Sequence, residues 1–346
     1  MRKFSNTQVK NAGKVLCNSS KYKKSEVEEA QEILTYWRTL HASTFNTFQS
    51  TLREKLKRLN VKDFLVAQRL KRGESIVKKL SRFSNMKLST MQDIAGLRAI
   101  LKNIKEVRSL ESNYKTSKFT HKLKDYKDYI SNPAPTGYRG IHLIYEYINE
   151  KNPDASGLKI ELQIRTKLQH TWATAVETMG TFLNHSLKSS QGPEEWLDYF
   201  SLVSAGFAIL EKCPIPPKYA FKSNKEIFQE IIDKTIELDV DKKLSGYTVA
   251  AEHIVKTQTN SKYNLIILNL DKRILNIKNY TKKQLQQANI DYTNIEKEII
   301  NGANLQAVLV STGSIESLRR AYPSYFLDSK EYLKKIELIK NRINKI

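Results

Sequence analysis

Three polar side chains alternate along a short apolar stretch near the middle of the chain. In LKIELQIRT, residues 158–166, Glu161, Gln163 and Arg165 stand at every second position. Residues two apart on a strand share a face, so these side chains should lie side by side, while the aliphatic residues between them pack on the other face. Such a polar face is either open to solvent or part of a site.

A second strand-like stretch supplies another acid and another arginine. In MQDIAGLRAIL, residues 91–101, Asp93 precedes the predicted strand and Arg98 lies on it. A single Asp at such a place is usually a cap or a turn residue. Two carboxylates on neighbouring strands, Asp93 and Glu161, would also suit Mg²⁺, which takes oxygen ligands. Arginine and lysine side chains would then bind the phosphates that the metal bridges.

Basic residues gather further upstream, in QRLKRGESIVKKLSR, residues 68–82. Arg69 and Lys71 precede a predicted helix, which carries Ser75 at its start and Lys79 one turn later. We expect the serine to cap this helix and to leave backbone amides free for an anion. The sequence contains neither GxxxxGK[ST] nor GxGxxG, so side chains would have to hold a nucleotide's phosphates. A solvated basic helix is the other interpretation.

A Pro/Gly-rich turn ends in an aromatic ring just before a further predicted strand. In SNPAPTGYRGIHLIYEYI, residues 131–148, Tyr138 follows Gly137 directly. The ring either packs against the protein or offers a flat face to a ligand.

The bulk composition limits the possible partners. The chain has 346 residues, a formal net charge of +22 and two cysteines, Cys17 and Cys213. The positive charge favours polyanionic partners such as nucleotides, RNA or DNA, although a solvated lysine-rich surface would also account for it. Two distant cysteines argue against a disulfide scaffold or a cysteine-rich zinc site. No apolar stretch is long enough to span a bilayer and no signal peptide is evident, so we expect a cytoplasmic protein without a membrane partner.

Apolar periodicity predicts an α+β fold, a mixed sheet flanked by helices. Strands are expected at 94–101, 141–148, 158–166, 247–257, 263–269, 273–278 and 305–311. Helices are expected at 25–58 (as one or two), 74–82, 169–183, 194–213, 225–238, 281–301, 313–321 and 328–345.

Composition shifts divide the chain into four parts. We expect an N-terminal helical segment at 1–54 and a main domain with the mixed sheet at 55–215. A linker helix is expected at 216–240, within and after a Pro-rich stretch, and a second, small α+β domain at 241–346.

Four segments resemble the RelA/SpoT synthetase domain in their order and spacing: QRLKRGESIVKKL, DIAGLR, DYISNPAPTGYRGIHL and IELQIRTKLQHTWA. The resemblance covers roughly residues 55–190. It implies the RelA/SpoT synthetase fold and an ATP-dependent pyrophosphokinase that uses Mg²⁺. Such enzymes move the β,γ-pyrophosphate of ATP to a ribose 3′-hydroxyl, and AMP leaves.

The resemblance also implies which residues bind ATP. Arg69 and Arg98 would sandwich the adenine ring through cation–π contacts. Gln163 would line the site. Basic and hydroxyl side chains would hold the phosphates: Lys71, Ser75, Lys79 and Arg165.

The acceptor side follows from the same resemblance. Tyr138 would stack on the acceptor base, with Lys127 and His142 beside it. Asp93 would bind Mg²⁺. Glu161 would be a second metal contact and the general base that activates the attacking hydroxyl.

A tyrosine pair near the C-terminus carries a second resemblance. Tyr322-Pro-Ser-Tyr325 resembles the YxxY element of CapRel-type fused toxin–antitoxin synthetases, although such a pair is usually a packing feature. The resemblance implies a C-terminal regulatory domain that folds back and holds both tyrosines over the adenine pocket near Arg69 and Arg98. A phage protein releases CapRel proteins from this block. Toxic members of the group pyrophosphorylate the tRNA 3′-CCA end and stop translation.

Three functions are compatible with these resemblances. The first is a self-inhibited toxin that modifies the tRNA 3′ end in phage defence. The charge of +22 favours it, as do Ala134 and Gly140, which stand where synthetases often carry Lys and Ser. The second is a guanosine tetra- or pentaphosphate synthetase with GDP or GTP as acceptor. The third is an inactive RNA-binding module, against which Asp93, Glu161 and Tyr138 argue.

Overall fold

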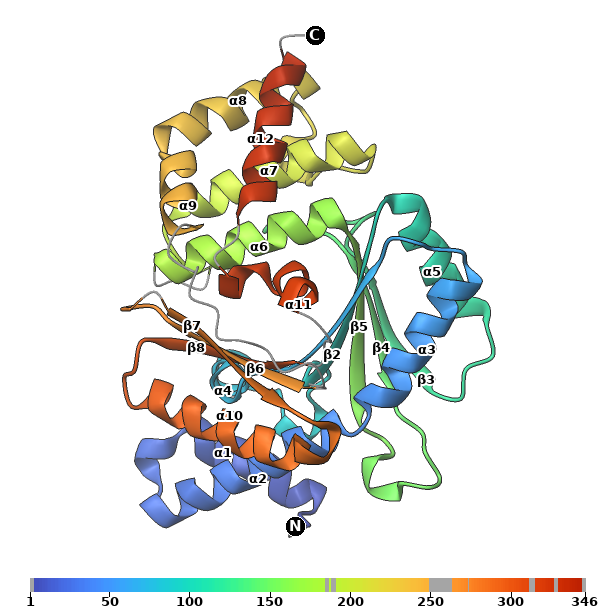
Figure 1. Ribbon diagram of the computed structural model, residues 1–346, viewed down its shortest axis with the longest axis vertical. Coiled ribbons are helices and arrows are strands. Elements are labelled where there is room, and N and C mark those ends of the chain that lie inside the picture. Colours follow the sequence, from blue (N-terminus) through green and yellow to red (C-terminus); the bar gives the residue numbers. More distant parts are fainter. Residues whose placement is uncertain are drawn as a thin grey trace.

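Two β-sheets organise the chain (Figure 1). The computed structural model describes residues 3–183, 187, 191–248, 263–272, 274–310, 315–326 and 329–343. In these residues, a five-stranded sheet lies in the N-terminal half of the chain and a three-stranded sheet lies toward the C-terminus.

The five-stranded sheet has the order β1-β2-β5-β4-β3. Its strands are β1 (Leu65–Leu70), β2 (Ala95–Leu101), β3 (Lys122–Asp128), β4 (Ile141–Glu146) and β5 (Lys159–Thr166). β2 and β5 run parallel, and the other three pairs are antiparallel. The mixed sheet expected from the sequence is therefore confirmed.

The helices of the N-terminal half are α1 (Asn6–Cys17), α2 (Lys24–Ala42), α3 (Phe45–Arg58), α4 (Gly73–Arg82) and α5 (Ile104–Thr116). Phe48, Leu52 and Leu56 follow one another at four-residue spacing on α3, so they share one helix face. They are buried in a single hydrophobic core with the strands of the five-stranded sheet. The helical stretch expected at 25–58 consists of two helices, since α2 ends before α3 begins.

A layer of helices lies at the top of Figure 1 and forms a second hydrophobic core. It contains α6 (Lys167–Phe182), α7 (Glu194–Glu211), α8 (Asn224–Glu237), α9 (Val240–Thr248) and α12 (Lys330–Ile343). Ile336 and Ile339 of α12 are buried there, and α12 lies against α8. The last helix therefore shares its core with helices that precede the three-stranded sheet. The division of the chain into four parts stays a prediction.

The three-stranded sheet is antiparallel and has the order β7-β6-β8. Its strands are β6 (Tyr263–Asn269), β7 (Ile274–Tyr280) and β8 (Leu305–Val310). One face packs on α10 (Leu285–Ile300), and the other packs on α11 (Ile315–Ala321) and the short 3₁₀ helix Pro323–Phe326. β8 and α11 also contact β1, and Figure 1 shows α11 between α6 and this sheet. The C-terminal part thus lies against the β1 edge of the first sheet.

Some elements were missed or misplaced at the sequence level. α1, β1, α5, β3 and α9 were not expected. β3 reads KLKDYKD and is largely exposed at the sheet edge, so it lacks the apolar run that predicts a strand. The strand expected at 247–257 is wrong at its start, because residues 247–248 end α9, and its remainder lies outside the described residues.

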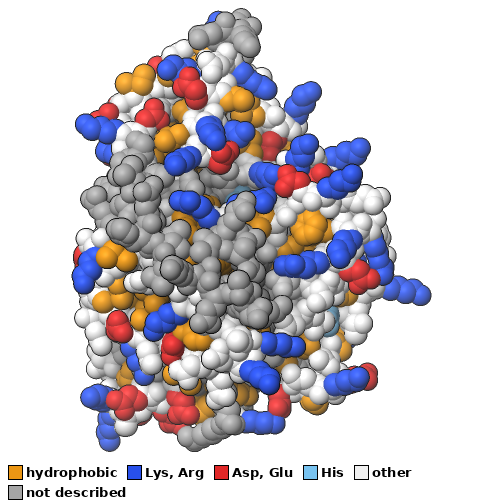
Figure 2. Space-filling model, in the orientation of Figure 1, with side chains coloured by type: hydrophobic (Ala, Val, Ile, Leu, Met, Phe, Trp, Pro, Cys, Tyr) orange, Lys and Arg blue, Asp and Glu red, His pale blue; other side chains and the backbone are white. Residues whose placement is uncertain are grey.

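Lys and Arg side chains are spread over the face drawn in Figure 2, from the upper helices to the N-terminal helices below. Much of the positive charge on this face is therefore dispersed. None of the described helices combines the length and the apolar character that a bilayer crossing needs.

Candidate active site

A cavity of about 590 Å³ opens between one face of the five-stranded sheet and the helices α6 and α7. Most of the side chains that the sequence assigned to a site line it: Arg69, Lys71, Asp93, Arg98, Tyr138, His142, Glu161, Gln163, Arg165 and Tyr322.

Strand register explains this convergence. Arg98 on β2 pairs with Gln163 on β5, and Gln163 pairs on its other side with His142 on β4. Paired residues of neighbouring strands point to the same face, so the three side chains form a row across the sheet. Glu161 and Arg165 lie two residues before and after Gln163 and line the same cavity, as their alternation predicted.

Two lysines hold Asp93. Its Oδ2 atom lies 3.0 Å from Nζ of Lys71 and 2.8 Å from Nζ of Lys79. Burial disfavours the charged carboxylate, but the two ammonium groups outweigh burial and lower the pKa of Asp93. The other oxygen, Oδ1, is buried and has no hydrogen-bond partner among the described residues. Asp93 is therefore ionised and has one oxygen left for a cation.

The carboxylates of Asp93 and Glu161 line the same cavity. No group of three or more His, Cys, Asp or Glu side chains suitable for a metal occurs in the described part of the chain. A Mg²⁺ ion at this pair would therefore complete its oxygen shell with phosphate or water oxygens, as magnesium commonly does in nucleotide sites. The Oδ1 atom of Asp93, which is buried without a hydrogen-bond partner among the described residues, is suited to be one of the oxygen ligands of this ion.

A chain of polar contacts joins Tyr138, His142 and Glu161. The Tyr138 hydroxyl lies 2.6 Å from Nε2 of His142, and Nδ1 of His142 lies 2.8 Å from Oε1 of Glu161. Gln163 donates a hydrogen bond of 2.7 Å to Oε2 of Glu161. Glu161 is thus hydrogen-bonded through both oxygens.

These contacts set the charges in the chain. Burial disfavours an imidazolium, but Tyr138 and Glu161 outweigh burial and raise the pKa of His142 to about 9. Burial also opposes ionisation of Glu161, yet the hydrogen bond and the charge of His142, together with the hydrogen bond from Gln163, outweigh burial and lower the pKa of Glu161. At neutral pH the site holds an imidazolium beside a carboxylate, and the imidazolium can donate to both of its neighbours.

The hydroxyl contact of Tyr138 was not expected from the sequence, and a stacking role for its ring stays a prediction. Tyr129, which sequence reasoning missed, also lines the cavity. Its ring packs edge-on against Tyr138 and His142, with centroid distances of 5.6 Å and 5.3 Å. The available signal was its place in DYISNPAPTGYRG, just before the Pro/Gly-rich turn.

The turn that carries Tyr138 is fixed onto α7. Gly137 has a φ of +86°, and its carbonyl oxygen accepts a hydrogen bond of 2.5 Å from Oγ of Ser204. A Cβ atom at Gly137 would lie 2.8 Å from Cβ of Ser204. Arg139 is buried and forms an ion pair of 2.8 Å with Glu211 at the end of α7. The turn therefore needs glycine both for its backbone angle and for its close approach to α7.

Three arginines give the cavity a positive wall. Arg69, Arg98 and Arg165 line it from β1, β2 and β5. The Nε atoms of Arg98 and Arg165 are buried without a hydrogen-bond partner in the described part of the chain. Arg69 forms an ion pair of 3.8 Å with Glu177 of α6. Sequence reasoning missed Glu177. Clustered guanidinium groups with open donors are suited to phosphate or a flat aromatic ring.

The two C-terminal tyrosines lie in different places. Tyr322 lines the cavity, is 4% exposed and donates a hydrogen bond from its hydroxyl to the carbonyl oxygen of Gln68 on β1. Tyr325 does not line the cavity. Its hydroxyl donates to the carbonyl oxygen of Ala307 at 3.3 Å, and Arg72 lies 6.0 Å from the centre of its ring. The structure therefore brings Tyr322, but not Tyr325, into the cavity.

The remaining candidates lie near the cavity without lining it. Lys79 reaches Asp93 from α4, and Ser75 lies in the first turn of the same helix. Lys127 lies on β3, exposed, where it pairs in register with His142.

The prediction that Ser75 caps α4 is wrong. The helix begins at Gly73, with Arg72 at the N-cap position. The Gly73 amide instead donates a hydrogen bond of 2.9 Å to Oε1 of Glu296, which lies on α10. Glu296 is also paired with Arg38 of α2, at 2.5 Å and 3.3 Å, and both side chains are buried. One carboxylate thus joins α10 to α2 and α4.

Comparison with known proteins finds one matching family and several relatives. Residues 68–182 match the model of a protein family described as "Region found in RelA / SpoT proteins". These residues are therefore similar to the region that the family description names. It is 34% identical over 125 residues to GTP pyrophosphokinase YwaC of Bacillus subtilis (strain 168), covering 34% of this chain and 59% of the relative. GTP pyrophosphokinase YjbM of the same organism is 34% identical over 112 residues, covering 32% and 52%. The chain thus spans little more than half the length of these relatives.

Solved structures give weaker matches. Small alarmone synthetase 1 from Bacillus subtilis bound to its product pppGpp has 24% sequence identity and a TM-score of 0.43, over 50% of this chain and 89% of that chain. Small alarmone synthetase 2 from the same organism has 26% identity and a TM-score of 0.43, over 51% and 92%.

Proposed function

We propose that this chain, through its RelA/SpoT region, is an ATP-dependent pyrophosphokinase. It would transfer the β,γ-pyrophosphate of ATP to a ribose 3′-hydroxyl. The observation that carries the proposal is the meeting of two ionised carboxylates, Asp93 and Glu161, with arginines and lysines in one cavity. Pyrophosphoryl transfer depends mainly on positioning and charge neutralisation, and such a cavity can supply both.

On the ATP side, the guanidinium groups of Arg69 and Arg98 would lie against adenine, and Lys71 and Lys79 would contact the phosphates. Both lysines lie on Asp93 in this structure and would exchange that carboxylate for phosphate oxygens. Asp93 and Glu161 would hold Mg²⁺, whose contribution when bound is to neutralise phosphate charge.

On the acceptor side, Tyr138 would support the base and Glu161 would take the proton of the attacking hydroxyl. The 3′-oxygen forms a bond to the β-phosphorus, the bond from that phosphorus to the α,β-bridging oxygen breaks, and AMP leaves with the bridging oxygen. Glu161 suits the role because its lowered pKa keeps it ionised. His142, hydrogen-bonded to Glu161, would fix the direction of the carboxylate.

We further propose that the structure described here is self-inhibited by Tyr322. Its ring shares the cavity with Arg69 and Arg98, where adenine would bind. A ligand that draws Tyr322 out would raise the fraction of chains able to bind ATP. A C-terminal regulatory part of this kind is compatible with a translation-blocking toxin of phage defence, released by a phage protein.

Two acceptors are compatible with the site. The names of the relatives, both GTP pyrophosphokinases, favour GDP or GTP and the synthesis of guanosine tetra- or pentaphosphate. Ala134, which lines the cavity without a charge, favours an acceptor with fewer phosphates at this point, such as the 3′-CCA end of tRNA. We rank tRNA first, in keeping with the net charge of +22.

One experiment tests these proposals. Full-length wild type, Tyr322→Ala and Tyr322→Ala/Glu161→Gln are given ATP labelled in its γ-phosphate, with GDP, GTP or deacylated tRNA. We expect label on one acceptor, more of it with Tyr322→Ala than with wild type, and none with the double variant. Tyr325→Phe is the matched control, since its hydroxyl lies outside the cavity.

The outcomes separate the proposals. A folded Tyr322→Ala protein that binds RNA but labels no acceptor would refute the enzyme and leave an RNA-binding module. Equal labelling by wild type and Tyr322→Ala would refute the self-block alone. Point variants are preferable to deletion of 241–346. That deletion removes α12 and exposes the hydrophobic core of the helical layer, in which Ile336 and Ile339 of α12 are buried.

A further inference from the structure

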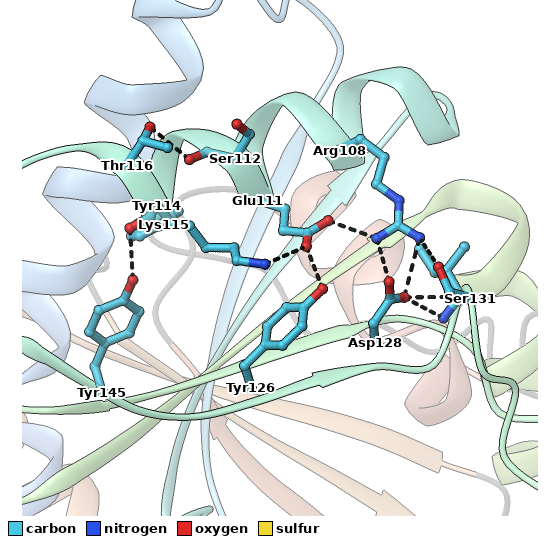
Figure 3. Close-up of polar contacts among 11 residues, drawn as sticks. Arg108, Glu111, Ser112, Tyr114, Lys115, Thr116, Tyr126, Asp128, Ser131 and Tyr145 are labelled. Carbon is cyan, nitrogen blue, oxygen red and sulfur yellow. Dashed lines mark hydrogen bonds and ion pairs between the residues drawn. The ribbon is translucent and has the colours of Figure 1, made fainter.

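A network of charged and hydroxyl groups joins α5 to the end of β3, outside the cavity (Figure 3). Its centre is Arg108 on α5. One guanidinium nitrogen, Nη1, donates to Oδ2 of Asp128 at 2.7 Å and to Oε2 of Glu111 at 2.8 Å. The other, Nη2, donates to Oγ of Ser131 at 2.8 Å and to Oδ1 of Asp128 at 3.3 Å. Arg108 thus binds Asp128 through both of its oxygens and reaches beyond it to the following turn.

The network needs the planar fork of arginine. Four bonds leave two nitrogens of one guanidinium group, toward three different side chains. A lysine would keep the charge but has a single nitrogen, so it cannot reproduce this geometry. Glu111 is held in turn by the hydroxyl of Tyr126, at 2.5 Å, and is therefore fixed itself.

Asp128 organises the turn that follows β3. Its Oδ1 atom accepts hydrogen bonds of 2.9 Å from the amides of Ile130 and Ser131, and its carbonyl oxygen accepts one of 3.1 Å from the amide of Asn132. Burial disfavours the charged carboxylate, but the hydrogen bonds from Arg108 and Ser131 outweigh burial and lower the pKa of Asp128 to about 2. The turn is thus tied to an ionised carboxylate that Arg108 ties to α5.

β3 itself contributes no buried side chain to the core, although Ile130 in the turn that follows is buried there. β3 is an edge strand with β4 as its neighbour in the sheet, its register shifts between Leu123 and Asp125, and most of its side chains are exposed or half-buried. Core packing therefore fixes the end of β3 less firmly than it fixes a central strand.

The turn leads directly to the acceptor side of the cavity. Tyr129 follows Asp128, and its amide donates a hydrogen bond of 2.9 Å to the carbonyl oxygen of Gly140. Its ring packs edge-on against Tyr138 and His142. A displaced turn would move the Tyr129 ring. Tyr138 and His142, which contact each other at 2.6 Å, would then lose the ring that packs against them.

We propose that Arg108 is a positioning residue for the acceptor: it holds the turn 128–132 so that Tyr129 braces Tyr138 and His142. The proposal rests on the proposed function, in which Tyr138 and His142 face the acceptor. The proposal predicts that Arg108 affects binding of the acceptor and has little effect on ATP, because the predicted ATP contacts come from β1, β2, β5 and α4 and not from β3 or the turn 128–132. A merely structural α5–β3 link would lower stability and affect both substrates alike.

Steady-state kinetics separates these alternatives. In the full-length Tyr322→Ala background, Arg108→Gln and Arg108→Lys are compared with Arg58→Gln, which removes an exposed ion pair with Glu54 on α3. Rates are measured against GDP, against deacylated tRNA and against ATP. We expect the KM for the acceptor to rise about tenfold in Arg108→Gln, since small misplacements at a reacting centre are costly. The KM for ATP should stay within about twofold, Arg108→Lys should be intermediate, and Arg58→Gln should match its parent.

A second readout needs no turnover. The chain has six histidines, so the His142 imidazole can be followed by NMR, with His142→Asn for assignment. The resonance should move in Arg108→Gln and stay in Arg58→Gln. An unmoved His142 resonance, or acceptor and ATP KM values that change equally, would overturn the role of Arg108. Absence of transfer in every protein would count against the proposed function alone, and the His142 resonance would still decide the role of Arg108.

Discussion

His142 should titrate far above the ordinary range of histidine. The pKa is raised from 6.5 to about 9, because Tyr138 and Glu161 outweigh the effect of burial. The imidazole is 16% exposed and lies 2.8 Å from the Glu161 carboxylate, so solvent weakens the pair little. The two neighbours predict a charged histidine throughout the physiological pH range.

The stability that follows can be worked out from this shift. A difference of about 2.5 units at about 1.4 kcal/mol per unit gives about 3.5 kcal/mol at most, of which about 3 kcal/mol separates pH 6 from pH 9.5. The folded pKa lies above the unfolded value, so this stabilisation is fully present below about pH 6.5 and is lost as the pH rises through about 9. The unfolding free energies of wild type and His142→Asn should therefore differ by about 3 kcal/mol less at pH 9.5 than at pH 6.

Urea unfolding at the two pH values measures this difference, and NMR titration of His142 measures the pKa directly. Asparagine cannot be protonated, so the variant removes the titration while keeping a hydrogen-bond donor. A difference in unfolding free energy between wild type and His142→Asn that does not change with pH would refute the reasoning. So would a His142 resonance that titrates near 6.5, since it would mean that burial cancels the effect of the two partners.

Two further predictions concern stability. Gly137→Ala should lower the free energy of unfolding by about 1–3 kcal/mol more than Gly157→Ala does. Both glycines have positive φ, but of the two only Gly137 lies against other atoms. Equal losses of unfolding free energy, measured by chemical denaturation, would contradict the close approach of Gly137 to α7. Glu296→Gln should cost about 3–5 kcal/mol, because it leaves Arg38 buried and without its charge partner. Glu54→Gln, from an exposed pair, should cost less than about 1 kcal/mol, and similar losses in the two variants would show that the buried pair is not special.

The part of the site that lies on strands could be predicted, because the period of a strand is simple. The alternation of Glu161, Gln163 and Arg165 gave a shared face, and the register with β2 and β4 then brought Arg98 and His142 beside them. These positions follow from local pattern plus pairing.

Contacts between distant segments could not be predicted. Arg38 and Glu296 are 258 residues apart, and neither has a local signal that names its partner. The true start of α4 also involves a distant residue: the helix begins at Gly73, and the Gly73 amide donates to a carboxylate from α10. Tyr322 and Tyr325 were treated as a pair, but the short 3₁₀ helix Pro323–Phe326 follows α11 and turns Tyr325 away from the cavity.

The route of the chain from α9 to α12 bears on how strong the proposed block must be. α9 and α12 both belong to the helical layer, so the segment between them leaves one anchored helix and returns to another. Tyr322 is then an inhibitor tethered at both ends, and its effective concentration at the cavity would be of the order of mM. A contact with an intrinsic Kd of only about 10 μM would keep roughly 99% of chains closed. A trigger would need to offset less than about 3 kcal/mol, and the block would reform at any protein concentration once the trigger left.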